Sequence, residues 1–290
     1  MFEGFKQHRL RVREATINAV MGGSGPALLL LHGYPQTYVM WHRLVPQLAQ
    51  HFTVVCTDLR GYGDSSKPAS TADHAVYSKR ATAQDQVEAM AALGFETFMA
   101  AGHDRGGRVL HRLLLDHPGR VTRAAVLDIV PTRHIFKTIN QQMATLYEHW
   151  FFLIQPNGFP EHLIAQDPDY YLTTKLRRWS AAPEAFTEAA MQEYQRCFRQ
   201  PETIHATCED YRAAATIDLA HDEADLDQKI QCPLLVLWGA KGAMEQHYDV
   251  LATWRDRASH VQGQALPCGH FLPEEAPQET AQALLAFFQA

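Results

Sequence analysis

Short apolar runs bounded by turn residues alternate along this chain with longer stretches of helical periodicity. The runs occupy residues 27–33, 52–61, 97–104, 123–131, 233–239 and 260–267. Runs of this kind are typical of strands buried on both faces, and the longer stretches between them are the crossover helices that parallel strands require. The alternation predicts an α/β protein with a mostly parallel central sheet flanked by helices.

The two ends of the chain carry different patterns. Residues 9–20 alternate between polar and apolar side chains, which predicts an antiparallel hairpin ahead of the parallel strands. Residues 277–290 place Leu284, Leu285 and Phe288 at helical spacing. This spacing predicts a terminal helix that packs on the sheet.

The strand pattern stops between residues 132 and 227. This segment is rich in aromatic and charged residues, has helical character, and is too long for a bare loop in a compact domain. It is interpreted as a helical cap inserted into the sheet domain. The predicted organisation is therefore a core of residues 1–131 and 228–290, with a cap of residues 132–227.

The overall composition excludes several classes of partner. The 290 residues are 46% hydrophobic and 20% charged, with a net charge of −6, which argues against broad affinity for nucleic acid or a membrane surface. No apolar run approaches the roughly 20 residues needed to cross a bilayer, and the first residues lack the apolar region of a signal peptide. An anionic ligand would have to be bound by a local group of cations.

The cysteines give no sign of cross-linking. They are odd in number, widely spaced and free of any C-x-x-C pair, which argues against a disulfide framework and against a zinc site. The five positions are Cys56, Cys197, Cys208, Cys232 and Cys268. The sequence therefore predicts a protein of the reducing cytoplasm that holds no metal.

The segment "GHDRGGR" contains the pattern Gly-x-Asp-x-Gly after a predicted strand and before a predicted helix. Gly102 and Gly106 permit a tight strand-to-helix turn that lifts the side chain of Asp104 above the carboxyl edge of the sheet. A carboxylate in this position is a candidate nucleophile. The alternative is that Asp104 only caps the following helix.

An acid and a histidine follow Asp104 in the order that this kind of site requires. Asp128 lies at the end of the next predicted strand, and His270 lies in "PCGHF" beyond the last one. The alternative for Asp128 is a strand-end cap. The loop after residues 233–239 offers only Glu245 as another acid, so Asp128 is the preferred partner of His270.

The segment "LLHGYPQT" places a His-Gly turn directly after an apolar strand. Such a turn supplies one backbone N–H of an oxyanion hole, and the residue after the nucleophile supplies the other. The expected donors are the backbone N–H groups of Tyr34 and Arg105. His32 itself is interpreted as a structural hydrogen-bonding residue.

Arg105 and Arg108 fall on one face of the first turn of the predicted helix. Cations there oppose the helix macrodipole at a cost of roughly 0.3 to 1 kcal/mol each. Charge-assisted hydrogen bonds to an anion contribute about 1.5 to 3 kcal/mol each, so a bound carboxylate would more than offset that cost. The pair is interpreted as a carboxylate clamp, and the alternative is two solvated arginines paired with surface acids.

The motifs "HGYPQT", "DLRGYGDSSKP", "GHDRGGR", "LDIVPT", "EHWFF" and "PCGHF" closely resemble those of the fluoroacetate dehalogenases in the α/β-hydrolase superfamily. The resemblance covers nearly the whole chain and implies the α/β-hydrolase fold. It implies that Asp104 is the nucleophile and that Asp128 and His270 complete a triad. It also implies that Arg105 and Arg108 hold the substrate carboxylate.

The resemblance further implies a halide site in the cap, formed by His149, Trp150 and Tyr211. An imidazole N–H, an indole N–H and a phenol O–H could together solvate a departing fluoride. Adjacent residues diverge on a regular helix, so His149 and Trp150 need irregular or terminal backbone to converge. The alternative is that they belong to the cap core. Trp179 matches a tryptophan of the pocket wall.

The implied activity is hydrolysis of haloacetates (fluoroacetate, chloroacetate and bromoacetate) to glycolate and halide through an ester of Asp104, without a cofactor. The ligand would be a small anionic 2-haloacid, and the resemblance also suggests a homodimer. One alternative is an epoxide hydrolase with the same triad, in which two cap tyrosines protonate the epoxide. The candidates are Tyr147, Tyr170, Tyr171 and Tyr194. Another is a non-catalytic receptor on the same fold.

Overall fold

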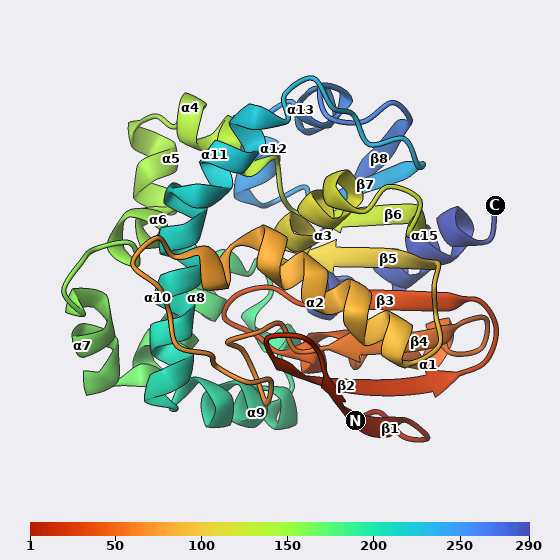
Figure 1. Cartoon of the computed structure of the whole chain (residues 1–290), viewed down its shortest axis with the longest axis horizontal. Coiled ribbons are helices and arrows are strands. Elements are labelled where there is room, and N and C mark those ends of the chain that lie inside the picture. Colours follow the sequence, from red (N-terminus) through yellow and green to blue (C-terminus); the bar gives the residue numbers. More distant parts are fainter.

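The computed structural model of the chain describes residues 1–290 and contains one eight-stranded sheet (Figure 1). The order across the sheet is β1-β2-β4-β3-β5-β6-β7-β8. The strands are β1 (Lys6–Arg11), β2 (Thr16–Gly23), β3 (Ala27–Leu31), β4 (Thr53–Thr57), β5 (Phe98–His103), β6 (Val121–Leu127), β7 (Leu234–Gly239) and β8 (Val261–Leu266).

Strands β3 to β8 pair in parallel, whereas β1 pairs with β2, and β2 with β4, in antiparallel fashion. The predicted parallel sheet and the amino-terminal hairpin are both confirmed. Every side chain of β3 and β5 is buried, as expected for central strands covered on both faces. These two strands carry the apolar sequences "ALLLL" and "FMAAGH".

Two strands end earlier than the apolar runs predict. The run 52–61 leaves the sheet after Thr57, and the run 123–131 leaves it after Leu127. Asp128 has a φ of 51°, which no extended strand residue adopts. Both departures place polar side chains at the carboxyl edge of the sheet, where α/β proteins bind ligands.

The helices of the core flank the sheet, and α2 and α3 pack against each other in front of it in Figure 1. The terminal helix α15 is present, as predicted, and contacts α1. The core helices are α1 (Val45–Leu48), α2 (Lys79–Ala92), α3 (Arg105–Asp116), α12 (Ala243–His247), α13 (Val250–Arg255), α14 (Leu272–Glu275) and α15 (Pro277–Phe288). No helix has the length and apolar character needed to span a membrane.

Between β6 and β7 the chain forms helices only, and these gather at one end of the sheet (Figure 1). The α-helices are α4 (Thr132–Thr138), α5 (Gln141–Leu146), α6 (Glu148–Phe152), α7 (Phe159–Gln166), α8 (Pro168–Trp179), α9 (Glu188–Phe198), α10 (Pro201–Ala215) and α11 (Ile217–Ala224). The helical character expected of residues 132–227 is therefore present. Their treatment as a separate cap remains a prediction.

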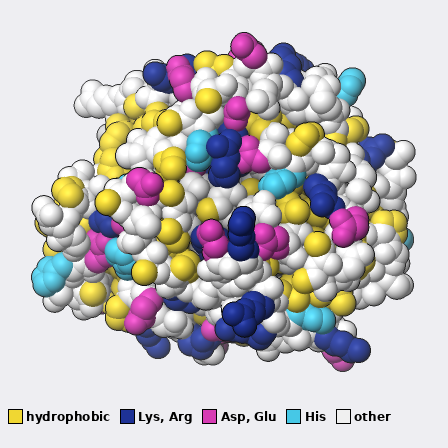
Figure 2. Space-filling view, in the orientation of Figure 1, with side chains coloured by type: hydrophobic (Ala, Val, Ile, Leu, Met, Phe, Trp, Pro, Cys, Tyr) yellow, Lys and Arg dark blue, Asp and Glu magenta, His cyan; other side chains and the backbone are white.

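The surface carries both signs of charge in close mixture. On the face drawn in Figure 2, Lys and Arg side chains are interspersed with Asp and Glu, and the hydrophobic atoms form scattered groups. A mixed surface of this kind creates no extended field of one sign. An anion would therefore be attracted by a local arrangement of cations and not by the molecule as a whole.

The turn between β5 and α3 is tightly packed. Asp104 at its tip has φ 46° and ψ −115°, and its side chain makes no capping hydrogen bond to α3. A Cβ on Gly102 would lie 2.5 Å from the carbonyl oxygen of Gly106, and one on Gly106 would lie 2.4 Å from that of His32. Only glycine fits at these two positions. Because the Asp104 side chain makes no capping hydrogen bond, the interpretation of Asp104 as a helix cap is wrong.

Replacement of Gly106 by alanine tests this packing. Because the clashing atoms are backbone, we expect a loss of about 3 kcal/mol or more in the free energy of unfolding, at the upper end of overpacking costs. The control is Gly119→Ala, where φ is 90° and no atom lies within 4 Å of the new Cβ. The control should lose only about 1 to 2 kcal/mol, from backbone strain. Urea denaturation compares the two, and equal losses would contradict the close approach.

Candidate active site

Three strand ends bring together the side chains predicted to form a triad. Asp104 lies between β5 and α3, Asp128 follows β6, and His270 lies between β8 and α14. His270 Nδ1 is 2.6 Å from Asp128 Oδ2, and His270 Nε2 is 3.9 Å from Asp104 Oδ2. None of the three residues is more than 7% exposed.

Each carboxylate of this group has one oxygen held by the backbone. The backbone N–H of Gly239 donates to Asp128 Oδ1 at 2.9 Å, which leaves Oδ2 for His270. The backbone N–H of Tyr34 donates to Asp104 Oδ1 at 2.9 Å, which leaves Oδ2 facing His270. Tyr34, predicted as an oxyanion donor, is therefore directed at Asp104. Arg105, the other predicted donor, is the first residue of α3.

His32 and Glu245, which were not predicted to be catalytic, both have other roles in the structure. His32 donates from Nδ1 to the Gly33 carbonyl and accepts at Nε2 from the backbone N–H of Leu59, so its ring is fully used in holding loops. Glu245 is exposed and accepts from the indole of Trp238. It makes no hydrogen bond to His270, whose Nδ1 is bound to Asp128.

The charges around His270 and Asp104 shift both pKa values. Burial lowers the pKa of His270, but the hydrogen bond and charge of Asp128, together with the charge of Asp104, more than offset this and raise it overall. Burial raises the pKa of Asp104, yet the neighbouring His270 and the two arginines lower it overall. Asp104 is therefore ionised in the neutral pH range, although it is buried.

His103 is a neighbour of the triad that the sequence analysis missed. Its Nε2 donates to the carbonyl oxygen of His270 at 2.7 Å, and the two rings lie 4.6 Å apart. Burial lowers the pKa of His103 to about 3, so its ring is neutral at pH 7. His103 holds the loop of His270 in place. Its position directly before Asp104 was the available signal.

A cavity of about 240 Å³ opens onto the triad. Its walls include Asp104, Asp128 and His270, and also Tyr147, His149 and Trp179 from the helices between β6 and β7. Trp179 also accepts from the backbone N–H of His270 at its carbonyl oxygen, at 3.0 Å. The predicted pocket-wall residue thus lies on the cavity, as do all three members of the predicted triad.

The two predicted clamp arginines do not line this cavity and are buried, being 1% and 3% exposed. The alternative of two solvated surface arginines is therefore wrong. Arg108 donates from Nη1 to the carbonyl oxygen of Val130 and to Thr132 Oγ1, both at 3.0 Å. Its Nε and Nη2 are buried without a partner. These two nitrogens form the edge of a guanidinium that binds a carboxylate through two parallel bonds.

Arg105 is held differently, and the sequence did not predict how. Its Nε donates to Asp210 Oδ2 at 2.7 Å and its Nη2 to the Asp210 carbonyl oxygen at 2.9 Å, so only Nη1 is buried without a partner. Arg105 can therefore give a ligand one hydrogen bond and not two parallel ones. Arg108 presents two nitrogens and Arg105 presents one.

The predicted halide residues form one aromatic group next to the arginines. The Tyr211 ring lies 4.1 Å from Arg105 Cζ and 5.5 Å from the His149 ring, and the Trp150 ring lies 4.7 Å from Arg108 Cζ. The Tyr211 hydroxyl and Trp150 Nε1 are buried without a partner, and His149 Nδ1 makes no hydrogen bond but lies 3.9 Å from Glu148 Oε2. Of the three residues, His149 lines the cavity, and Trp150 and Tyr211 do not.

The backbone meets the condition set for His149 and Trp150 to converge. Both lie in the first turn of α6, which has only five residues, and Tyr147 before it has an irregular backbone with φ −102° and ψ 33°. Burial lowers the pKa of His149 to about 4, so its ring is neutral at pH 7. A neutral imidazole still has one N–H to donate.

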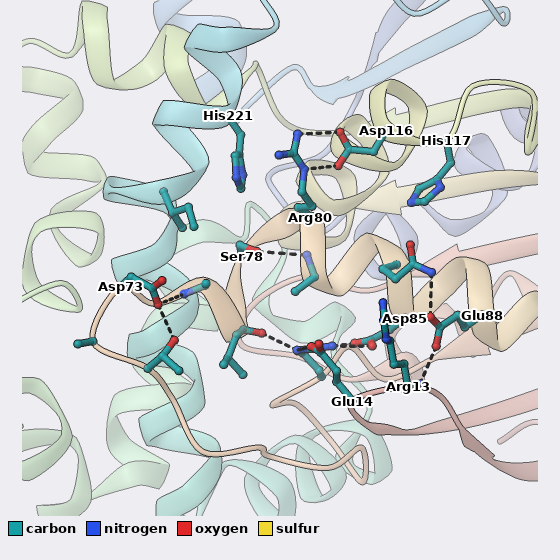
Figure 3. A pocket seen from close by; sticks show the side chains of 18 residues that line it. Arg13, Glu14, Asp73, Ser78, Arg80, Asp85, Glu88, Asp116, His117 and His221 are labelled. Carbon is teal, nitrogen blue, oxygen red and sulfur yellow. Dashed lines mark hydrogen bonds and ion pairs between the residues drawn. The ribbon is translucent and has the colours of Figure 1, made fainter.

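A larger hollow of about 1020 Å³ runs along α2, away from this group (Figure 3). Its charged side chains are engaged with one another, as in the pairs of Arg80 with Asp116 and of Arg60 with Asp85. None of the predicted site residues lines it. The smaller cavity at the strand ends is therefore the candidate active site.

Comparison with known proteins agrees with this architecture. A model of the α/β hydrolase fold matches residues 26–277. A fluoroacetate dehalogenase from Burkholderia sp. is 48% identical over 99% of this chain and 95% of its own length. A soluble epoxide hydrolase from Corynebacterium sp. (strain C12) is 32% identical over 97% and 96%. A structure from Nostoc sp. PCC 7120, described as an α/β hydrolase, is 62% identical with a TM-score of 0.99 over 99% of both chains.

The sheet order, the turn before α3 and the matched model define an α/β hydrolase. Within that superfamily the chain belongs to the fluoroacetate dehalogenase family.

Replacement of Asp104 by asparagine tests the electrostatic coupling to His270. Because the Asp104 charge helps to raise the pKa of His270, its removal should lower that pKa. NMR titration of the His270 ring measures the change. Asp222→Asn, which removes a buried carboxylate from α11, is the control and should leave the His270 pKa unchanged. An unchanged pKa in the Asp104 variant would show that the two groups are not coupled.

Proposed function

We propose that the protein hydrolyses small 2-haloacids, converting fluoroacetate, chloroacetate and bromoacetate to glycolate and halide. One observation carries this proposal. An ionised carboxylate at the tip of a glycine turn, Asp104, is accompanied by two buried arginines that retain three nitrogens without partners. Buried donors of this kind are costly unless an anionic ligand satisfies them. The similarity to a fluoroacetate dehalogenase supports the same substrate class.

In the first step a carboxylate oxygen of Asp104 attacks the α-carbon of the haloacid in line with the halogen. A carbon–oxygen bond forms, and the carbon–halogen bond breaks, so the halide leaves with the bonding electrons. Arg108 binds the substrate carboxylate through Nε and Nη2, and Arg105 adds one bond from Nη1. The donors of His149, Trp150 and Tyr211 solvate the departing halide.

In the second step His270 removes a proton from water, and the resulting hydroxide attacks the carbonyl carbon of the Asp104 ester. The backbone N–H groups of Tyr34 and Arg105 stabilise the oxyanion. Collapse of this intermediate breaks the ester bond, the departing alkoxide of glycolate takes up the proton of the new Asp104 carboxyl group, and the Asp104 carboxylate is restored. His270 then releases its proton to solvent. Aspartate serves here because its alkyl ester can be hydrolysed, whereas an alkyl ether of serine could not. Neither step uses a cofactor or a metal.

The electrostatics of the pair favour this order of events. The charge of Asp104 contributes to the raised pKa of His270 in the free enzyme. Formation of the ester removes that charge, so the pKa of His270 falls when the imidazole has to accept a proton from water. The Asp128 hydrogen bond at 2.6 Å keeps the ring oriented throughout.

An epoxide hydrolase is the alternative with the same triad, and a soluble epoxide hydrolase is among the relatives. That reaction would use two cap tyrosines as proton donors. Of the four candidates, only Tyr147 lines the cavity; Tyr170 is 71% exposed, and the hydroxyls of Tyr171 and Tyr194 are bonded to Tyr34 and Glu274. An epoxide substrate does not require a carboxylate, so it would leave the two buried arginines without a role in binding. These contacts favour the haloacid.

The remaining parts of the proposal rest on the family and on composition. A homodimer follows from the family resemblance. A cytoplasmic location agrees with five cysteines that are all free thiols. A non-catalytic receptor is disfavoured because it would not require a nucleophile, an acid and a base in contact.

Halide release by the purified protein tests the proposed function. With fluoroacetate or chloroacetate we expect one halide ion and one glycolate per substrate, measured by ion-selective electrode and chromatography. Styrene oxide serves as the comparison substrate. Formation of the diol without halide release from any haloacetate would favour the epoxide hydrolase, and neither activity would favour a receptor.

The halide donors should matter most for the poorest leaving group. Removal of one donor in Tyr211→Phe or Trp150→Phe should lower fluoroacetate turnover about tenfold more than bromoacetate turnover, since fluoride depends most on hydrogen bonds. Rates of halide release give the ratio. Tyr77→Phe, a buried phenol bonded to the Pro68 carbonyl, is the control and should leave the ratio unchanged. Equal losses for both substrates would assign Tyr211 and Trp150 to packing.

A further inference from the structure

One residue of the cap occupies the whole side edge of the Arg105 guanidinium. Asp210, on α10, accepts from Arg105 Nε at its carboxylate and from Arg105 Nη2 at its backbone carbonyl, at 2.7 and 2.9 Å. The next residue, Tyr211, covers the face of the same guanidinium at 4.1 Å from Cζ. Edge and face are thus fixed by two consecutive cap residues, and Nη1 is the nitrogen left over.

The Asp210 carboxylate is itself held from the core. Tyr62 donates its hydroxyl to Oδ2 at 2.8 Å, and Lys79, from α2, donates to Oδ1. Lys79 also lies 3.5 Å from the carboxylate of Asp218 on α11. Arg105, Lys79, Asp210 and Asp218 are all at most 6% exposed. The group is therefore a buried network of two cations and two carboxylates that joins the cap helices to the core.

The two cations keep the Asp210 carboxylate ionised, whereas burial raises the pKa of Asp218. Burial raises the pKa of Asp210, but the charges and hydrogen bonds of Arg105 and Lys79 outweigh it and hold the pKa well below its usual range. A buried ion pair of this kind adds little net stability, because desolvation offsets the attraction between the charges. Its value lies in fixing geometry, since an arginine side chain otherwise has several freely rotating bonds.

We propose that Asp210 is a positioning residue for carboxylate binding, which turns Arg105 so that Nη1 alone is offered to the ligand beside Arg108. Tyr62 and Lys79 keep the Asp210 carboxylate in place. Because Asp210 belongs to α10 and Arg105 to α3, the carboxylate clamp is complete only when α10 is docked on the core. This inference rests on the proposed function, in which the two arginines bind a carboxylate.

Replacement of Asp210 by asparagine removes the charge and keeps the size and the backbone carbonyl. Arg105 then keeps the bond from Nη2 to the carbonyl oxygen but loses the charged acceptor at Nε. Its edge is held less firmly, and the affinity for an anionic ligand should fall. Calorimetry with glycolate, the carboxylate product, and with glycolamide, its neutral analogue, measures the effect without turnover. We expect glycolate affinity to fall about tenfold or more, the loss of one charge-assisted bond, while glycolamide affinity changes little. In steady-state kinetics the KM for chloroacetate should rise more than kcat falls.

Asp222→Asn is the matched control. Asp222 lies on α11, is 8% exposed, and pairs with Arg112 of α3 at 3.0 Å. It is the same kind of buried contact between the segment after β6 and the core, but Arg112 has no buried nitrogen without a partner that it could offer to a ligand. The ratio of glycolate to glycolamide affinity should match the wild type. If this variant shifts the ratio as much as Asp210→Asn does, any loss of such an ion pair has the effect, and the positioning role is refuted.

Other outcomes of these measurements also test the positioning role of Asp210. Equal loss of both ligands in Asp210→Asn would overturn the proposal, since it would indicate a general structural defect. If circular dichroism shows that Asp210→Asn is unfolded, Tyr62→Phe replaces it, because this change removes one bond to the carboxylate and no charge. A smaller shift of the same sign, about two- to fivefold, is then expected, and no shift would overturn the proposal.

The same measurements separate this inference from the proposed function. If the wild-type protein releases halide from no haloacid but binds glycolate in a manner that depends on Asp210, the dehalogenase proposal fails and the positioning role stands. If halide is released but glycolate affinity is unaffected by Asp210→Asn, the reverse holds.

Discussion

A buried carboxylate that stays ionised is the constraint on which the rest of this structure depends. Asp104 is 6% exposed, and an uncompensated carboxylate at that depth would cost several kcal/mol. The backbone N–H of Tyr34, the imidazole of His270 and the two arginines provide the compensation. Each of these groups is buried as well, so each needs further partners in turn. The positions of the residues around the site follow from these successive requirements for charge and hydrogen-bond partners.

The two arginines also need hydrogen-bond partners, and these come from the segment between β6 and β7. Arg108 is satisfied in part by the chain that leaves β6, at Val130 and Thr132. Arg105 is satisfied by Asp210, some distance further along the chain. The guanidinium of Arg105 lies over the Tyr211 ring and that of Arg108 over the Trp150 ring, and three of their nitrogens remain without partners. The sheet therefore supplies the charges, and the helices decide which of their hydrogen bonds stay available to a ligand.

Topology explains why much of this was predictable from the sequence. Parallel strands end at one edge, so polar residues that follow them meet there, and Asp104, Asp128 and His270 could be named from strand-end positions alone. The features of the site that strand-end positions did not predict also have physical explanations. Asp210 and Arg105 are 105 residues apart, and a run of helices has no fixed register that would pair them. The halide group was reached only through family resemblance, because no spacing rule brings His149 near Tyr211.

The central claim is that Asp104 is a nucleophile that forms an ester, and isotope labelling tests this claim most directly. A single turnover of chloroacetate, with enzyme in excess in oxygen-18 water, should place one heavy oxygen in the Asp104 carboxylate and none in the hydroxyl of glycolate. Peptide and product mass spectrometry give both readings. Heavy oxygen in the first-turnover glycolate, with an unlabelled Asp104 peptide, would mean that Asp104 activates water as a base and would contradict the account.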